Sequence, residues 1–272
     1  MVMTHRRSHI THRFNTGLLM PPAPIVLTDA DNTLWDTDAV FAKAQLSLLT
    51  GVERATGKCV SGSGRLSFVR EYDQAIAARH HLHFRYPRGM LARALRLGLE
   101  CIPPSKAAHD IVRGRTLAFE LPAGVVDSLV TEFDRSLRTE PILLPGVREG
   151  LELAKETGLT TYVLTEGHVH RQSELVEHFG LRKLVSGILE VTKNERQFAR
   201  LKTRFSPANV YVVGDQRDRD IAPALAAGCI AILVPSRFRP KSQDGKYAMN
   251  PNYVADDFFK AISWVVDRQR PY

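Results

Sequence analysis

The sequence predicts an α/β fold, a doubly wound parallel sheet of the Rossmann-like type joined to an all-helical region. Short apolar runs bounded by polar or glycine-rich sequence indicate buried strands at Ile25–Thr28, Thr160–Leu164, Val210–Val213 and Ile230–Val234. Helical patterns lie between them, at Val147–Thr157, Arg171–Phe179, Glu195–Phe205 and Ile221–Ala227. Strands that alternate with such helices indicate a parallel sheet covered on both faces.

The predicted domains follow the places where these patterns change. Residues 1–23 carry basic residues without apolar periodicity, and we expect a disordered tail there. Residues 24–37 and 141–272 form the predicted α/β core, interrupted by a helical domain at 38–140. A serine and glycine cluster and a proline pair divide that domain into helices, at Ser61–Gly64 and Pro103–Pro104.

Composition narrows the class of protein. A hydrophobic content of 44% over 272 residues is ordinary for a chain with a buried core. No apolar run approaches the roughly 18 residues that cross a bilayer, so we expect no membrane partner. Three widely spaced cysteines without a metal-binding pattern favour a reduced, cytoplasmic location. The net charge of +8 is spread along the chain without interleaved aromatic residues, so no nucleic-acid partner is expected.

Acidic residues follow two of the predicted strands. Asp29 and Asp31 come directly after the first strand, and Asp215, Asp218 and Asp220 follow the strand Val210–Val213. In open parallel sheets ligands bind beyond the carboxyl ends of the strands, where these groups fall. Carboxylates brought close together repel unless a cation lies between them, and oxygen-only ligation suits Mg²⁺. The pattern predicts a magnesium site.

Four separated motifs resemble those of the haloacid dehalogenase-like hydrolase superfamily. The first is Asp29-Ala30-Asp31-Asn32-Thr33 after an apolar strand, with Asn32 in place of the commoner glycine. The second is the strand end Val163-Leu164-Thr165, and the fourth is Gly214-Asp215 with Asp220. The third, a lysine before a helix, is Lys193, although Asn194 replaces the proline that often follows it. Lys202, deep in a helical pattern, is the rival lysine.

The resemblance implies a role for each of these positions. Asp29 would attack phosphorus to give an aspartyl-phosphate, and Asp31 would protonate the leaving group and then activate water. Thr165 and Lys193 would complete the catalytic set by contacting the phosphoryl group. Mg²⁺ would be held by Asp29, the backbone carbonyl of Asp31 and Asp215, with Asp220 in direct or water-mediated support.

Substrate-binding positions are expected beside the second motif and in the helical domain. Thr165, Glu166 and Gly167 would line the pocket, and Arg70 would reach it from the domain that covers the site. Other polar residues of that domain share its expected position, namely Arg65, Tyr72, Arg85 and Arg88.

Structural interpretations stand beside the functional ones. A lone Asp-x-Asp after a strand is common as a turn, and Asp220 could simply open the following helix as a cap. The histidines His80, His81 and His83 lack the spacing of a zinc pair, so a surface cluster is expected.

The predicted function is a Mg²⁺-dependent phosphomonoester hydrolase that acts on a small phosphorylated metabolite, as a monomer or homodimer. A haloacid dehalogenase would lack the second carboxylate and the metal, so Asp31 and Asp215 argue against it. Two alternatives stay open: a phosphohexomutase on the same fold, and a non-catalytic phosphate-binding regulatory module.

Overall fold

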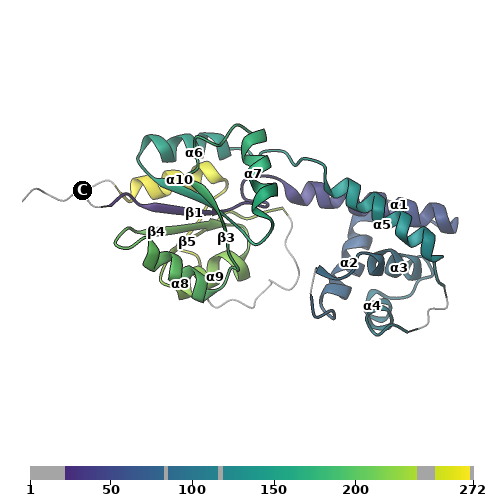
Figure 1. Ribbon diagram of the computed structural model, residues 1–272. Coiled ribbons are helices and arrows are strands. Elements are labelled where there is room, and N and C mark those ends of the chain that lie inside the picture. The colour runs from purple at the N-terminus through teal and green to yellow at the C-terminus, as the bar shows by residue number, and fades with distance from the viewer. Residues whose placement is uncertain (1–21, 83–84, 116–118, 238–248, 270–272) are drawn as a thin grey trace, which may run out of the picture.

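The computed structural model describes residues 22–82, 85–115, 119–237 and 249–269, and its centre is a parallel six-stranded sheet (Figure 1). The strands pair in the order β3-β2-β1-β4-β5-β6. Their bounds are β1 Ile25–Asp29, β2 Thr160–Thr165, β3 Gly187–Glu190, β4 Val210–Gly214, β5 Ile230–Leu233 and β6 Tyr253–Val254. The predicted α/β fold is therefore confirmed, whereas the predicted tail falls almost wholly outside the described residues.

The strand order places the carboxyl ends of β1, β2 and β4 side by side. Asp29 at the end of β1 is level with Leu164 of β2, and Thr28 is level with Val213 of β4. β2 and β3 lie on one side of β1, and the chain then crosses back so that β4 pairs with the other side of β1. Such a reversal opens a crevice at the carboxyl ends of the strands, where ligands of open α/β sheets bind.

Successive residues of β1 point to opposite faces of the sheet, as the alternation of a strand requires. Val26 joins the apolar cluster under α6 (Val147–Glu156), α7 (Val169–His178) and α10 (Phe258–Asp267). Leu27 joins the cluster under α8 (Glu195–Arg204) and α9 (Ala222–Ala226). Figure 1 shows these two helical layers on opposite sides of the sheet. Both faces of β1 are thus buried from solvent, which explains its uninterrupted apolar sequence.

A helical bundle lies to one side of the sheet and has an apolar cluster of its own (Figure 1). Its long helices α1 and α5 run side by side, α2 and α3 pack against α1, and α4 packs against α2 and α3. The bounds are α1 Thr37–Thr56, α2 Arg65–Ala77, α3 Gly89–Gly98, α4 Pro104–Val112 and α5 Ala123–Leu137. The Ser61–Gly64 cluster and the proline pair separate helices as expected. The exact domain boundaries stay a prediction.

The first bundle helix begins and ends at residues suited to those positions. The side chain of Asp36 accepts a hydrogen bond from the backbone N–H of Ala39 at 2.9 Å, which caps the start of α1. Gly57 ends the helix in the left-handed region, with φ of 70°, and its N–H bonds to the carbonyl of Glu53. The helix therefore starts directly behind the first acidic motif.

Several features differ from the sequence-based expectation. Strands β3 and β6 and helix α10 were not predicted. The two strands give a weak signal, because β3 is short and only partly buried and β6 has two residues. His80 is buried, with its ring stacked on that of His81 at 4.4 Å, so the expected surface histidine cluster is wrong for this residue. His83 lies outside the described residues.

Two further expectations concern the environment of the chain. All three cysteines are free thiols. In the described part of the chain, no helix combines the length and the apolar character that a membrane span requires.

Trp35 packs beneath the loop that carries the first acidic motif. Its side chain is fully buried and stacks on Phe179 with ring centroids 6.1 Å apart, while its carbonyl accepts the N–H of Asn32 at 2.8 Å. We expect Trp35→Ala to lower the free energy of unfolding by about 3–5 kcal/mol because a large cavity opens under this loop. Urea unfolding followed by circular dichroism measures the change.

Ile142→Ala is the matched control, because Ile142 is 66% exposed. We expect it to change the free energy of unfolding by no more than about 0.5 kcal/mol. Equal effects of the two substitutions would contradict the packing role of Trp35.

Candidate active site

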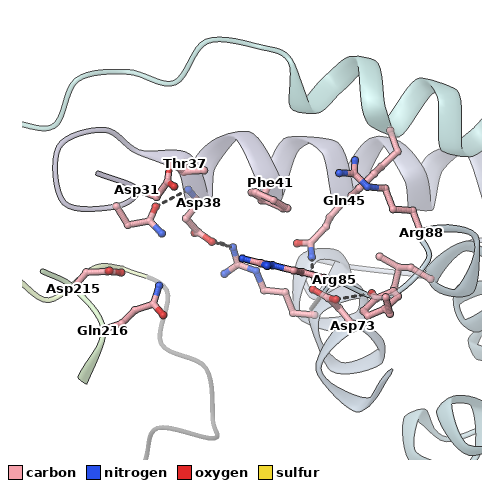
Figure 2. Close-up of a pocket in the computed structure, with 15 residues that line it drawn as sticks. Asp31, Thr37, Asp38, Phe41, Gln45, Asp73, Arg85, Arg88, Asp215 and Gln216 are labelled. Atoms are coloured by element: carbon pink, nitrogen blue, oxygen red, sulfur yellow. Dashed lines mark hydrogen bonds and ion pairs between the residues drawn. The ribbon is translucent and has the colours of Figure 1, made fainter. Parts of the chain in front are cut away.

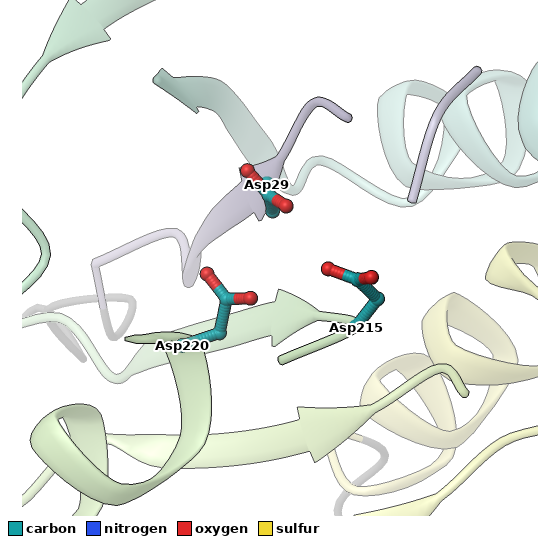
Figure 3. A group of neighbouring side chains, drawn as sticks. All are labelled: Asp29, Asp215 and Asp220. Atoms are coloured by element: carbon teal, nitrogen blue, oxygen red, sulfur yellow. The ribbon is translucent and has the colours of Figure 1, made fainter. Parts of the chain in front are cut away.

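Three buried aspartates meet at the carboxyl edge of the sheet (Figure 3). Asp29 ends β1, Asp215 directly follows β4, and Asp220 lies in the single π-helical turn η2 (Arg217–Ile221). Each offers a carboxylate oxygen, and these atoms all lie within 4.8 Å of one another. The structure thus brings together three of the four aspartates expected near a metal ion.

Lys193 is buried among these carboxylates. Its ammonium group contacts Asp29 and lies 2.7 Å from Asp220 Oδ1. The lysine precedes α8, whose first turn is capped by the side chain of Asn194 through a 3.0 Å bond from the N–H of Gln197. Asn194 therefore caps the helix at the position where the family often has a proline.

Lys202, the rival lysine, lies at the opposite end of the strands from the aspartates. It projects from α8 and donates a hydrogen bond to the carbonyl of Gly228 at 2.6 Å. Gly228 comes shortly before the start of β5, so this contact is at the amino ends of the strands. Of the two lysines, only Lys193 is placed where it contacts the aspartates.

Asp215 and Asp220, which both follow β4, differ in how many of their carboxylate oxygens accept hydrogen bonds. Asp220 uses one oxygen for Lys193 and the other for the backbone N–H of Gln216, at 3.0 Å. Asp220 therefore both positions the lysine and holds the start of η2. Asp215 has a buried oxygen, Oδ1, without a hydrogen-bond partner among the described residues. A buried unpaired carboxylate oxygen is costly, and a metal ion is a partner that fits this donor set.

Burial opposes the charge of these carboxylates. Burial raises the pKa of Asp29, Lys193 opposes that rise, and the neighbouring aspartates add to it. Burial raises the pKa of Asp215 to about 7, with a further contribution from Asp220. Burial alone would lower the pKa of Lys193, but Asp220 and Asp29 raise it above its ordinary value, so the lysine stays charged. A cation would favour the ionised carboxylates.

The loop after β1 fixes the second aspartate of the motif. Asp31 Oδ1 accepts a hydrogen bond from the hydroxyl of Thr37 at 2.7 Å, and Oδ2 lies 3.4 Å from the amide nitrogen of Gln172. Asn32 has φ of 59°, a left-handed conformation that asparagine tolerates better than most residues. Its side chain also accepts the N–H of Asp38 at 2.7 Å, a bond that glycine could not make.

The loop after β2 contributes a hydroxyl and an acidic clamp. Thr165 is buried, and its Oγ1 accepts the N–H of Gly167 at 2.9 Å, which leaves the hydroxyl proton for another acceptor. Glu166 accepts the backbone N–H of Lys193 at 2.7 Å and pairs with Arg219. Burial would raise the pKa of Glu166, but Arg219 and the N–H of Lys193 hold it below its ordinary value. Glu166 thus ties the second, third and fourth motifs together.

A pocket of about 580 Å³ connects this edge of the sheet to the helical bundle (Figure 2). Asp31 and Asp215 line its inner part, and Arg70, Arg85 and Arg88 line its outer part. Arg70 lines the pocket and pairs with Asp38 at 2.7 Å, so its role in substrate binding stays a prediction.

Two other polar residues named for the helical domain are not among those that line the pocket. Arg65 pairs with Glu53 at 2.6 Å, and the hydroxyl of Tyr72 donates to the carbonyl of Ile102 at 2.5 Å.

Sequence reasoning missed several residues that the fold adds to the site. Gln172 reaches Asp31 from α7, Arg219 clamps Glu166, and Gln45 and Asp73 line or support the pocket from α1 and α2. Arg219 and Glu166 are 53 positions apart and meet only in the fold, so no local pattern in the sequence indicates this pair.

Comparison with known proteins gives a family match and a shared fold. A family model described as a hydrolase, haloacid dehalogenase-like hydrolase, matches residues 24–228. No curated protein sequence matches the chain.

Three similar solved structures share the fold at low sequence identity. A haloacid dehalogenase-like family hydrolase from Xanthomonas campestris has a TM-score of 0.57 and 18% identity, covering 91% of this chain and 93% of that chain. YfnB from Bacillus subtilis, bound to magnesium, has a TM-score of 0.57 and 14% identity, covering 90% and 99%. A predicted phosphoglycolate phosphatase from Haemophilus somnus 129pt has a TM-score of 0.58 and 18% identity, covering 89% and 98%.

The close approach of Asp220 to β4 requires glycine at position 214. A Cβ atom added to Gly214 would lie 2.3 Å from Cγ of Asp220. We expect Gly214→Ala to lower the free energy of unfolding by about 1–3 kcal/mol, because the buried Asp220 must move away from Lys193. The matched control is Gly124→Ala, where a Cβ meets open space in α5 and helix propensity favours alanine. Urea unfolding distinguishes them, and an unchanged Gly214→Ala variant would refute the packing argument.

Proposed function

The chain belongs to the haloacid dehalogenase-like hydrolase family, and from that premise we propose that it is a Mg²⁺-dependent phosphatase acting on a small phosphorylated metabolite. The observation that carries the proposal is the meeting of Asp29, Asp215 and Asp220 with the charged Lys193, in a cluster whose Asp215 lines the inner part of the pocket. Anionic ligands bearing a phosphoryl group suit a site that pairs a fixed ammonium with a cation held by carboxylates.

Asp29 is the proposed nucleophile. Its carboxylate oxygen forms a bond to phosphorus as the bond from phosphorus to the leaving oxygen breaks, which yields an aspartyl-phosphate and an alkoxide. Burial supports this role, because a desolvated carboxylate is a stronger nucleophile than one surrounded by water, provided that it stays ionised. Lys193 favours the ionised form of Asp29.

Asp31 is the proposed acid and base. It lines the pocket that receives the leaving group, and its two oxygens are oriented by Thr37 and Gln172. In the first step Asp31 gives its proton to the leaving alkoxide. In the second it takes a proton from the water that attacks phosphorus, which returns Asp29 as a free carboxylate and releases phosphate.

The remaining residues bind and orient the phosphoryl group. Thr165 can donate its hydroxyl proton to a phosphoryl oxygen, while Lys193 places a positive charge beside Asp29. Mg²⁺ would be held by the carboxylates of Asp29 and Asp215 with the carbonyl of Asp31. When bound, it neutralises charge on the transferring oxygens. Asp220 would support the site indirectly by positioning Lys193, because its two oxygens already contact Lys193 and the backbone N–H of Gln216.

Release of inorganic phosphate separates this proposal from its rivals. A phosphohexomutase would convert a sugar 1-phosphate to the 6-phosphate without net release, and a regulatory module would turn over no substrate. We propose hydrolysis because Asp31, the group that would activate water, lines the same pocket that would receive the leaving group. A panel of phosphomonoesters, assayed with Mg²⁺ and with chelator, tests the choice.

Asp29→Asn should abolish turnover and trapping of the phosphoenzyme. We expect kcat to fall by at least about 10³-fold, because the amide keeps the shape of the side chain but is not a nucleophile. The readouts are phosphate release and the acid-stable label that a radioactive phosphomonoester leaves on the protein. Asp127→Asn, on the exposed face of α5, is the matched control and should behave like the unaltered chain. Labelling of Asp29→Asn would end the assignment.

Mg²⁺ should stabilise the protein more at about pH 8 than at about pH 5. Without metal, the folded-state pKa of Asp215 of about 7, above its ordinary 3.8, gives a stabilising contribution that is full below pH 3.8 and is lost as pH rises through about 7. Metal ions bind the ionised carboxylates and reverse that loss. We expect the Mg²⁺-induced rise in Tm to vanish in Asp215→Asn and to persist in Asp127→Asn. An equal rise in both variants would remove Asp215 from the metal site.

A further inference from the structure

The pocket extends well beyond the groups that would handle a phosphoryl group. Its volume is about 580 Å³, and it runs from Asp31 and Asp215 to Arg85 and Arg88 at the helical bundle. Figure 2 shows this arrangement, with Asp215 and Gln216 at one end and Gln45 and Arg88 at the other. Pockets of this size enclose most of the surface of a small ligand. A leaving group bound past Asp31 would therefore meet the residues of the bundle.

Of the three arginines in the outer part, two already have acidic partners. Arg70 pairs with Asp38 at 2.7 Å, and Arg88 pairs with Asp134. Among the described residues Arg85 makes no ion pair, although it lines the same pocket. A guanidinium group offers a planar set of donors that matches a carboxylate or a phosphate.

Gln45 supplies an independent sign of a missing ligand group. Only 5% of the residue is exposed, and its amide nitrogen donates to Asp73 Oδ2 at 2.8 Å. Asp73 is held from its other oxygen by the hydroxyl of Tyr86 at 2.6 Å, which fixes the carboxylate and hence the amide. Oε1 of Gln45 has no donor among the described residues. A buried acceptor left unpaired is destabilising, so a donor from a ligand would be stabilising.

We propose that the substrate is a phosphorylated hydroxy acid, whose leaving group carries a second anionic group bound by Arg85 and a hydroxyl that donates to Gln45. This inference rests on the proposed phosphatase function and names the class of its substrate. Apart from Asp215, which is assigned to the metal, the described lining offers Arg85 without an ion pair and the buried Oε1 of Gln45 without a donor. These two groups together favour a charged, hydroxylated chain over a neutral one. Leu91 and Phe133 pack against its carbon atoms.

The test compares 6-phosphogluconate with sorbitol 6-phosphate, which share their carbon chain and differ at the far carbon, a carboxylate in one and a hydroxymethyl in the other. We expect kcat/KM to be about tenfold or more higher for 6-phosphogluconate, since a hydrogen-bonded charge contributes at least that much. Arg85→Gln should bring the ratio of the two kcat/KM values down about tenfold. Arg93→Gln, an exposed arginine of α3 outside the pocket lining, is the control and should keep the ratio.

Binding to the Asp29→Asn variant provides a second readout that needs no turnover. Calorimetry should show tighter binding of 6-phosphogluconate than of sorbitol 6-phosphate, and loss of that difference when Arg85→Gln is added. Sorbitol 1,6-bisphosphate distinguishes the two kinds of anion. If it binds more tightly than 6-phosphogluconate, the group bound by Arg85 is a second phosphate and the hydroxy-acid proposal is overturned.

The outcomes separate the two proposals. Equal kcat/KM and equal affinity for the matched pair, together with phosphate release that depends on Asp29, would overturn the hydroxy-acid proposal and leave the phosphatase intact. Absence of phosphate release from every compound of the panel would overturn the phosphatase, and the affinities would still decide whether Arg85 binds a second anion.

Discussion

Three carboxylates buried beside one ammonium group are the constraint on which the rest of the site depends. Asp29, Asp215 and Asp220 carry three negative charges when ionised, and Lys193 supplies one positive charge, so two negative charges remain unbalanced. Inside a protein such an excess is expensive, because desolvation and repulsion act together. A divalent cation balances it. The raised pKa of Asp29 and of Asp215 expresses the same imbalance in terms of protons.

Contacts of the Glu166 side chain and the close approach of Asp220 to β4 hold this arrangement together. Glu166 joins the loop after β2 to the backbone of Lys193 and to Arg219 of η2, so it links three segments of the chain. Gly214 allows Asp220 to lie directly against β4, where its carboxylate reaches the ammonium group. These contacts make the spacing of the charged groups a property of the sheet edge rather than of individual rotamers, which is the condition for a preorganised site.

The core could be predicted from sequence because its signals are local. The apolar runs before Asp29, Thr165 and Asp215 indicate strands, and parallel strands bring their carboxyl ends together whatever their separation in the chain. β3 and β6 escaped prediction because short, half-exposed strands have no distinct apolar pattern. Roles inside the site depended on contacts across the sheet. Lys193 lies just before α8 and Lys202 lies in its last turn. The direction of the helix places Lys193 beside the aspartates and Lys202 at the amino ends of the strands.

In the bundle, the position of a residue around its helix decides whether its side chain faces the pocket, whereas in the core the polar residues of the site follow the strand ends. Arg65 and Arg70 are five residues apart on α2, which rotates them by about 140° around the helix. Arg65 therefore meets Glu53, away from the pocket, while Arg70 meets Asp38 within it. The sequence does not reveal which face of α2 is turned toward the pocket, because both arginines are equally suited to a solvated surface. Chemistry can accordingly be read from the core motifs, whereas selection of the leaving group depends on how the bundle packs beside them.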